Sequence, residues 1–280
     1  MTLGSPIDNP RILDSMQKRL LTISLIVLVT LTLQSHEFWL QPKKFKYALN
    51  EEMTVGFLVD ESFDGEPWDL KNNKIEKLEL SHLAKTTDLR LQVKPDAKEK
   101  LKYKFVEEGT YLLSMQSNEA YVELDAEKFN DYLKEDGLEN VIDIRTKTNT
   151  LDKPSKEFYS RYVKLLVQAG NKTDDTFKKK TAMRIEIIPK QNPYLMKSGD
   201  YLQCLVLFNG QPLKNQMVKV WNKIGNTTFQ QNNYTENDGT LKFPISSKGP
   251  WMVSTVMMIP SEKPGADWQS FWSSLVFGIE

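Results

Sequence analysis

The stretch TTFQQNNYTENDGTLKFPI, residues 227–245, decides the fold that this sequence predicts. It holds two short strand-like runs, and the Asp-Gly pair at 238–239 between them supplies the positive φ that a tight hairpin turn requires. Similar runs flank it in MRIEIIP, DYLQCLVLFNGQPL, QMVKVWNK, GPWMVSTVMMIP and WQSFWSSLVFGIE. About seven short strands, with turn-forming residues roughly every ten positions, predict an immunoglobulin-like β-sandwich over residues 183–280.

The preceding residues, 36–170, predict a second domain that is also mainly β. MTVGFLVDE, IEKLELSHL, DLRLQV and GTYLLSMQS are short runs in which apolar and polar residues partly alternate. EFYSRYVKLLVQAG, residues 157–170, favours a strand entered by a helical turn. The polar, lysine-rich segment 171–182 then reads as a linker between the two domains.

A short helical insertion is predicted inside the first domain, at about 125–147. Asp125 is a plausible N-cap and Gly137 a plausible stop, and a second short helix follows. Three large side chains before the stop recur at i, i+3 and i+4, as on one face of a helix: Phe129, Tyr132 and Leu133.

The composition limits the classes of function. The chain has 280 residues, of which 40% are hydrophobic, so it can bury a substantial core. Lys plus Arg and Asp plus Glu each total 37, so no net charge favours nucleic acid, and we expect no nucleic-acid partner. A single cysteine, Cys204, excludes an intramolecular disulfide and a thiolate-rich metal cluster, and we expect it to be inert packing.

The amino-terminal region, residues 1–35, predicts export. From Met16 the sequence reads MQKRLLTISLIVLVTLTLQS, a basic start followed by a short apolar run and then small or polar residues. This order is typical of a secretory signal peptide, with translation starting at Met16 and cleavage after Ser35. The alternative is an uncleaved anchor helix, but the apolar run is short for a membrane span. We therefore expect a periplasmic protein with no stable membrane span after cleavage.

Cleavage after Ser35 would make His36 the first residue of the mature chain. A terminal histidine offers its α-amine and a ring nitrogen to one metal ion, and this pair suits copper(II) or nickel(II). The only other histidine, His82, is the candidate for a second ligand. In the alternative interpretation His36 only begins a strand, HEFWLQP, and His82 is a packing or surface residue.

No catalytic motif stands out in the sequence. Serine and cysteine triads need a histidine base, and the G-x-S-x-G, P-loop, G-x-G-x-x-G and H-E-x-x-H motifs are absent. The acidic loop DESFDGEPWD, 60–69, could bind a cation or a sugar, and the aromatic run GADWQSFWSSL, 265–275, could form a stacking platform for carbohydrate. The simpler interpretations are a solvated loop and a closed core. A copper enzyme that uses both histidines is a further possibility, but a non-catalytic protein is better supported.

Several stretches together resemble one bacterial family of unknown function. They are HEFWLQP after the signal, AYVELDAEKFNDYLKEDGLENV, SRYVKLLVQAG, NPYLMKSGDYLQCLVLFNGQPLKNQMVKVW, NDGTLKFPI, GPWMVSTVMM and DWQSFWSSLVF. Members of this family are often labelled nickel-uptake, substrate-specific proteins. The resemblance implies an exported, mostly β protein of a Gram-negative envelope that takes part in metal traffic, and the family's opening histidine corresponds to His36.

The function expected from these observations is that of a periplasmic, non-catalytic binding protein. It would handle copper or nickel through His36, with His82 as a possible second ligand, and its partner would be the metal ion or an envelope transport component. The alternative is a metal-free module of the cell envelope that binds carbohydrate or protein.

Overall fold

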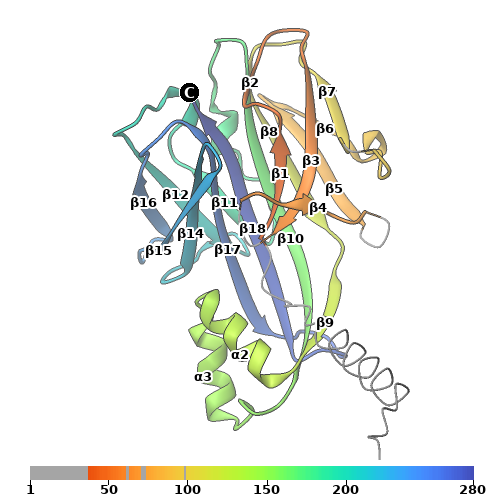
Figure 1. Ribbon diagram of the computed structural model, residues 1–280, viewed down its shortest axis with the longest axis vertical. Coiled ribbons are helices and arrows are strands. Elements are labelled where there is room, and N and C mark those ends of the chain that lie inside the picture. Colours follow the sequence, from red (N-terminus) through yellow and green to blue (C-terminus); the bar gives the residue numbers. More distant parts are fainter. Residues whose placement is uncertain (1–36, 61–62, 71–73, 98) are drawn as a thin grey trace, which may run out of the picture. The chain divides into compact units, whose positions relative to one another are not determined.

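A computed structural model describes residues 37–60, 63–70, 74–97 and 99–280. They belong to one compact unit, which runs from Ser35 to Glu280. This unit is mainly β, as predicted, and its described part contains two α-helices (Figure 1). Residues 1–35, which include the predicted signal peptide, lie outside the described part. No described helix combines the length and the apolar character that crossing a membrane would require.

A large central sheet organises the chain. In the described residues it has ten strands, with the main order β15-β14-β17-β18-β10-β8-β5-β6 (Figure 1). Its members are β2 (Lys46–Tyr47), β5 (Ile75–His82), β6 (Lys85–Asp88), β8 (Gly109–Ser117), β9 (Ala120–Leu124), β10 (Ser155–Ala169), β14 (Met217–Ile224), β15 (Thr227–Tyr234), β17 (Gly249–Pro260) and β18 (Trp268–Ile279). β10 runs parallel to β18 and to β2, and antiparallel to β8 and β9.

Two smaller sheets complete the fold. The first contains β1 (Glu37–Pro42), β3 (Glu52–Asp60), β4 (Glu66–Pro67) and β7 (Leu101–Lys104). The second contains β11 (Ile185–Pro189), β12 (Tyr201–Phe208), β13 (Gln211–Pro212) and β16 (Thr240–Pro244). About seven strands are predicted for residues 183–280, and the structure has eight there, β11 to β18, divided between this second small sheet and the central sheet.

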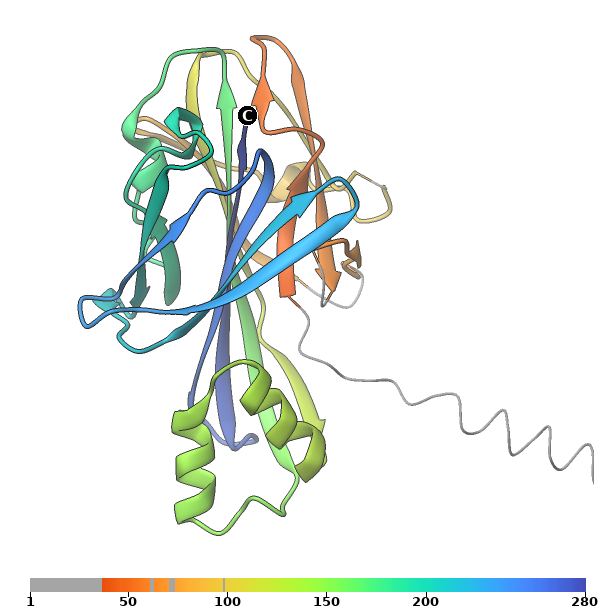
Figure 2. The same ribbon diagram turned by 60° about the vertical axis from the view of Figure 1, so that its left-hand side comes forward.

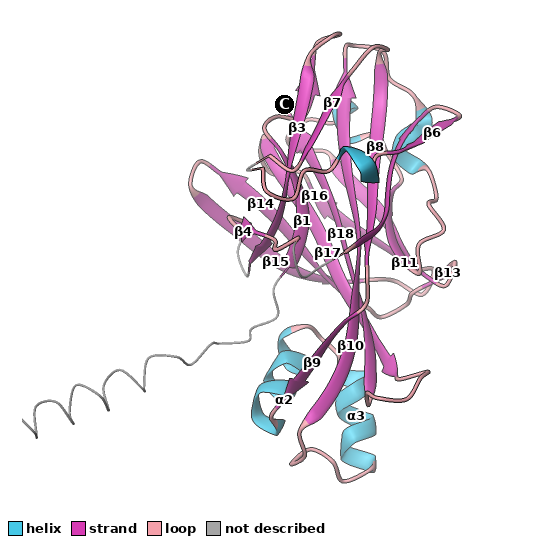
Figure 3. Cartoon of the chain, turned by 90° about the vertical axis from the view of Figure 1, so that its right-hand side faces the viewer, coloured by secondary structure: helices cyan, strands magenta, loops and turns pink. Residues whose placement is uncertain are grey.

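The two small sheets cover opposite faces of the central sheet, because neighbouring residues of its strands enter different cores. Leu165 of β10 packs in one core with Trp39 and Phe57, whereas the next residue, Leu166, packs in the other with Val206 and Phe243. A strand buried on both faces carries apolar residues at successive positions, as β10 does at Leu165, Leu166 and Val167, and its polar neighbours Lys164 and Gln168 are buried as well. The fold thus has three layers of sheet. Figure 3 shows how far strands dominate the described chain.

The helical insertion lies at one end of the long strands β10, β17 and β18 (Figure 2). It comprises α2 (Ala126–Glu135) and α3 (Glu139–Lys147). The side chain of Asp125 accepts a 2.9 Å hydrogen bond from Lys128 N, which confirms the predicted N-cap. Gly137 has φ +62°, and Leu138 N donates to Leu133 O at 2.8 Å, which closes the helix as predicted.

The Asp-Gly turn at 238–239 does not form a hairpin, and this prediction is wrong. Gly239 has the expected positive φ of +77°, but the strands on its two sides join different sheets. β15 pairs with β14 in the central sheet, whereas β16 pairs with β12 in the second small sheet. The turn is therefore a corner at which the chain crosses from one layer to another.

Two further details differ from the sequence predictions. DLRLQV is not a strand, because Asp88 Oδ1 accepts from Arg90 N at 2.9 Å and the chain turns into the 3₁₀ helix η1 (Arg90–Gln92). β10 begins directly at Ser155, without the helical turn expected there.

The segment predicted as a linker, 171–182, contains the 3₁₀ helix η2 (Asp175–Lys178). Another 3₁₀ helix, η3 (Pro193–Leu195), lies outside this segment and precedes β12. Thr176 and Phe177 are buried, so part of this segment is packed. Strands from both sides of it pair within the central sheet, as β10 does with β18. The two-domain division at 171–182 stays a prediction.

Candidate functional site

The two predicted metal ligands have different places in the structure. His36 lies outside the described residues, and its neighbour Glu37 is the first residue described. His82 is the last residue of β5 and is 9% exposed.

The His82 ring is held in place by groups from several parts of the chain. It stacks on the Tyr111 ring, with centroids 4.2 Å apart, and its Nδ1 lies 3.1 Å from Thr110 O. A carbonyl oxygen can only accept a hydrogen bond, so a neutral ring carries its proton on Nδ1 and keeps a lone pair on Nε2. Nε2 is buried, has no hydrogen-bond partner in the described structure, and lies 3.7 Å from Glu107 Oε2. Asp174 Oδ2 lies on the other side, 3.9 Å from Nδ1.

The start of β1 is firmly anchored. Glu37 pairs with Asp60 of β3, and Ser274 of β18 donates its hydroxyl hydrogen to Phe38 O at 2.7 Å. Trp39 has no exposed surface; its ring packs edge-on against that of Phe63, with centroids 5.4 Å apart, and β1 also contacts β10 and β18 of the central sheet. The residue before Glu37 is therefore attached to a rigid strand.

The Glu37 side chain enters a buried polar cluster. Lys219 Nζ of β14 lies 3.6 Å from Glu37 Oε1 and 2.6 Å from Asp136 Oδ1, at the end of α2. Burial raises the pKa of Glu37 to about 7, although Lys219 opposes this rise. Burial tends to lower the pKa of Lys219, but the two nearby carboxylates outweigh it, so the pKa is raised and the ammonium ion is favoured.

A second buried carboxyl, Glu157 of β10, extends this cluster. Its Oε1 accepts hydrogen bonds from the Tyr132 hydroxyl, at 3.2 Å, and from the Ser270 hydroxyl. Burial also raises the pKa of Glu157 to about 7, and the nearby Asp136 adds to the rise. Glu157 Oε2 has no hydrogen-bond partner among the described atoms. The site can therefore hold protons on two carboxyls near neutral pH.

The histidine and the start of β1 lie at different levels of the central sheet. Ser274, which bonds to β1, pairs with Val163 of β10, whereas Thr110, which contacts His82, is paired with Gln168 of the same strand. Five residues along a strand span about 17 Å. Within the described ranges, no group of three or more His, Cys, Asp and Glu side chains is arranged to hold a metal ion.

Sequence reasoning missed this cluster. Its ionisable members are far apart in the chain and come from β1, the end of α2, β10 and β14, so no spacing indicates that they meet: Glu37, Asp136, Glu157 and Lys219. Only Glu37 could have been noticed from the sequence, because it directly follows His36, the predicted first residue of the mature chain.

The two alternative surfaces differ in how they are packed. In the acidic loop, of which residues 61–62 lie outside the description, the acids Asp64, Glu66 and Asp69 are exposed, as in a solvated loop, but Phe63 and Trp68 are only 3% and 5% exposed. In the aromatic run, Trp268 and Phe271 are 6% and 3% exposed and close cores instead of forming a stacking platform.

Comparisons with known proteins identify a family without a known function. The sequence matches the family described as "Domain of unknown function (DUF4198)" over residues 33–259. No curated protein matches it.

The solved structures with some similarity are distant. Salmonella alpha-2-macroglobulin reacted with methylamine shares 10% identity over 86% of this chain, with a TM-score of 0.24, and the chain spans only 15% of that protein. The three N-terminal domains of the bacteriophage RB49 outer capsid protein Hoc share 8% identity, with a TM-score of 0.22, over 88% of this chain and 71% of theirs. The titin fragment I67–I69 shares 13% identity, with a TM-score of 0.20, over 86% of this chain and 65% of its own length. These likenesses carry no functional argument.

Proposed function

We propose, from the premise that this chain belongs to the DUF4198 family, that it is an exported, non-catalytic binding protein which holds one copper(II) or nickel(II) ion at its amino-terminal segment. It would act in the periplasm, and its partner would be an envelope transport component that supplies or receives the ion.

The anchoring of β1 is the observation that supports this proposal most. Glu37 is paired in a sheet and its side chain is buried, so its backbone position is fixed. The Cα atoms of adjacent residues lie about 3.8 Å apart, so removal of the signal after Ser35 would leave His36 as a free terminus beside a rigid strand. A chelate of α-amine and imidazole attached to such a support loses little conformational entropy on binding.

Other donors must complete the site. The Glu37 carboxyl is buried beside Lys219, so the backbone amides of the terminal segment are the better-placed donors, and copper(II) accepts tetragonal sets of nitrogen and oxygen. His82, with its free Nε2 beside Glu107, is a second donor pair at another level of the sheet. We therefore expect one ion to bind with high affinity at the His36 chelate, and a further ion at His82 to bind separately and much more weakly.

Three proteins test the terminal site: the chain that starts at His36, the same chain with one residue added before it, and His36→Ala. Blocking the amine should weaken copper binding about as severely as removing the ring, because either change destroys the chelate. Calorimetry would give the affinities, and electron paramagnetic resonance would show whether nitrogen ligands are lost. Affinity should fall steeply below about pH 6, since both nitrogens must be unprotonated to bind.

His82→Ala serves as the matched control and should keep the high-affinity site. Equal copper binding by the three terminal variants, or no binding by any of them, would contradict the proposal.

A further inference from the structure

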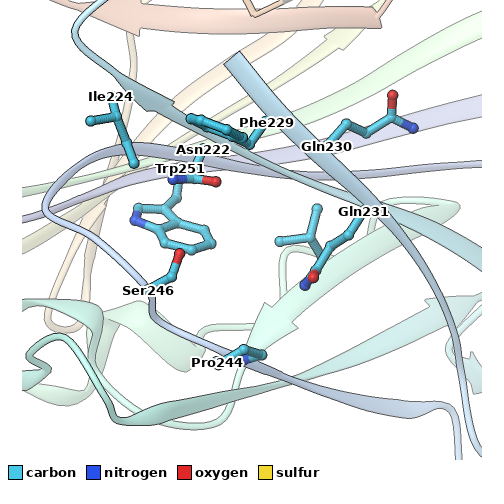
Figure 4. A pocket seen from close by; sticks show the side chains of 9 residues that line it. Asn222, Ile224, Phe229, Gln230, Gln231, Pro244, Ser246 and Trp251 are labelled. Carbon is cyan, nitrogen blue, oxygen red and sulfur yellow. The ribbon is translucent and has the colours of Figure 1, made fainter. Parts of the chain in front are cut away.

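A cavity of about 310 Å³ lies where the central sheet extends past the second small sheet (Figure 4). β14, β15 and Trp251 of β17 form one wall, and Pro244, the last residue of β16, and Ser246 form the other. β15 pairs with β14 and has no second strand partner in the described structure. Part of the inner face of this sheet is therefore left open at the side of the sandwich.

The strand register brings the functional side chains of this cavity together. Asn222 of β14 is paired with Phe229 of β15 on one side and with Trp251 of β17 on the other. Val220 pairs with Gln231, so the Gln231 side chain lies on the same face. Figure 4 shows the two aromatic rings and the Gln231 amide around one open space.

Hydrogen bonds hold two polar side chains of the cavity in place, but some hydrogen-bonding atoms around it have no partner in the described structure. Asn222 is 8% exposed, and its Nδ2 donates a 2.8 Å hydrogen bond to Ser247 Oγ. Trp251 Nε1 donates to Ser247 O at 3.1 Å, which fixes the indole. In the described structure neither Asn222 Oδ1 nor the Gln231 side-chain amide has a hydrogen-bond partner. The Asn222 oxygen and the exposed Gln231 amide therefore both remain accessible to a ligand in the cavity.

We infer that this cavity binds a unit of a neutral oligosaccharide. All nine lining residues are uncharged in a chain of which 26% is charged, so an ionic ligand would find no partner to offset its loss of hydration. Sugar hydroxyls both donate and accept hydrogen bonds, and so do side-chain amides. The apolar face of a sugar ring can pack on the ring of Phe229, which is 51% exposed, while Trp251 forms the base.

A peptide strand is the less suitable occupant. A peptide adds to a sheet through the backbone edge of its outer strand. The groups described above are side chains on the inner face of β14, β15 and β17, and Pro244 and Ser246 limit the space opposite them.

The test is binding of maltotetraose, cellotetraose and tetra-N-acetylchitotetraose to the chain that starts at His36. Saturation-transfer NMR would detect contact, and calorimetry would measure affinity. We expect at least one of the three to bind, and Phe229→Ala and Gln231→Ala each to weaken it about tenfold, the effect of losing roughly 1.4 kcal/mol. Tyr234→Ala is the matched control, because Tyr234 is 54% exposed on the same strand but does not line the cavity.

The His36→Ala protein should bind the sugar normally, so this test is independent of the terminal metal site. Circular dichroism would show that each variant is folded. The inference is wrong if none of the three sugars binds at millimolar concentration, or if binding is the same in the Phe229 and Gln231 variants as in the wild type. An extended polar peptide should be tested in the same way. The inference is also wrong if this peptide binds the wild type and binds the Phe229 and Gln231 variants more weakly, while none of the sugars behaves in this way.

Discussion

At the scale of single residues, burial controls the chemistry of the cluster beneath β1. Glu37 and Glu157 are 5% and 2% exposed, and loss of hydration disfavours their charged forms. The partners of Glu157 are neutral hydroxyls, so no positive charge in direct contact opposes this effect. Its proton therefore stays bound up to neutral pH.

The Glu157→Gln variant should show a weaker dependence of stability on pH. The pKa of Glu157 is raised from 4.5 to about 7, so between these values the folded state holds a proton that the unfolded state has released. The free energy of unfolding therefore falls as pH rises through this window and levels off above it. Glutamine mimics the protonated acid, so the variant should gain on the order of 3 kcal/mol relative to wild type between pH 4.5 and 8.

Urea unfolding at several pH values would measure this change. Glu123→Gln is the matched control, because Glu123 is exposed on β9, the strand next to β10. A parallel pH dependence in wild type and Glu157→Gln would show that Glu157 is already ionised in the folded protein.

At the scale of elements, a buried ion pair joins the central sheet to the second small sheet. Lys164 Nζ of β10 lies 2.6 Å from Glu186 Oε2 of β11, and the two side chains are 2% and 3% exposed. The same oxygen accepts from Thr181 N and Thr181 Oγ1, both at 2.9 Å. These bonds fix how β11 is positioned over β10.

Lys164→Met should destabilise the protein by about 3–5 kcal/mol, because it leaves the Glu186 carboxylate buried without its partner. The double variant Lys164→Met, Glu186→Leu should recover more than half of this loss, since no unpaired charge remains. Urea unfolding would provide both values. The exposed pair of Lys102 and Glu52 is the control, and Lys102→Met should have no measurable effect. A double variant no more stable than the single one would contradict this account.

At the scale of the whole molecule, the central sheet joins the two halves of the chain. β10, from before the predicted linker, is flanked by β18 from the end of the chain over nine residue pairs, Glu157↔Trp268 to Leu165↔Val276. Each small sheet needs a face of this shared sheet to bury its own apolar side chains. The chain can therefore be divided at 171–182 into two stretches of sequence, although each stretch needs strands of the other to bury its apolar side chains.

Trypsin should cut first in the segment 171–182, where Lys172, Lys178 and Lys180 are exposed. The two fragments should nevertheless elute together in size-exclusion chromatography under native conditions, because β10 stays paired with β18. They should separate only in denaturant. Early cuts inside 183–280, or fragments that separate without denaturant, would show that this description of the molecule is wrong.

The sequence by itself determined the local elements. The positions of most strands, the cap at Asp125 and the stop at Gly137 follow from side-chain periodicity and from backbone preferences, which act over a few residues. The opening histidine was also visible in the sequence, together with its place directly before the strand that begins at Glu37.

Only the tertiary structure decided which elements meet. The turn at 238–239 has the local chemistry of a hairpin, yet β15 and β16 join different sheets, because strand pairing depends on contacts between distant residues. The buried carboxyls of Glu37 and Glu157, and the cavity beside Trp251, arise for the same reason. Periodicity indicates which face of a strand is apolar, but the partner that covers this face is chosen by packing across the whole chain, and that choice leaves no local pattern.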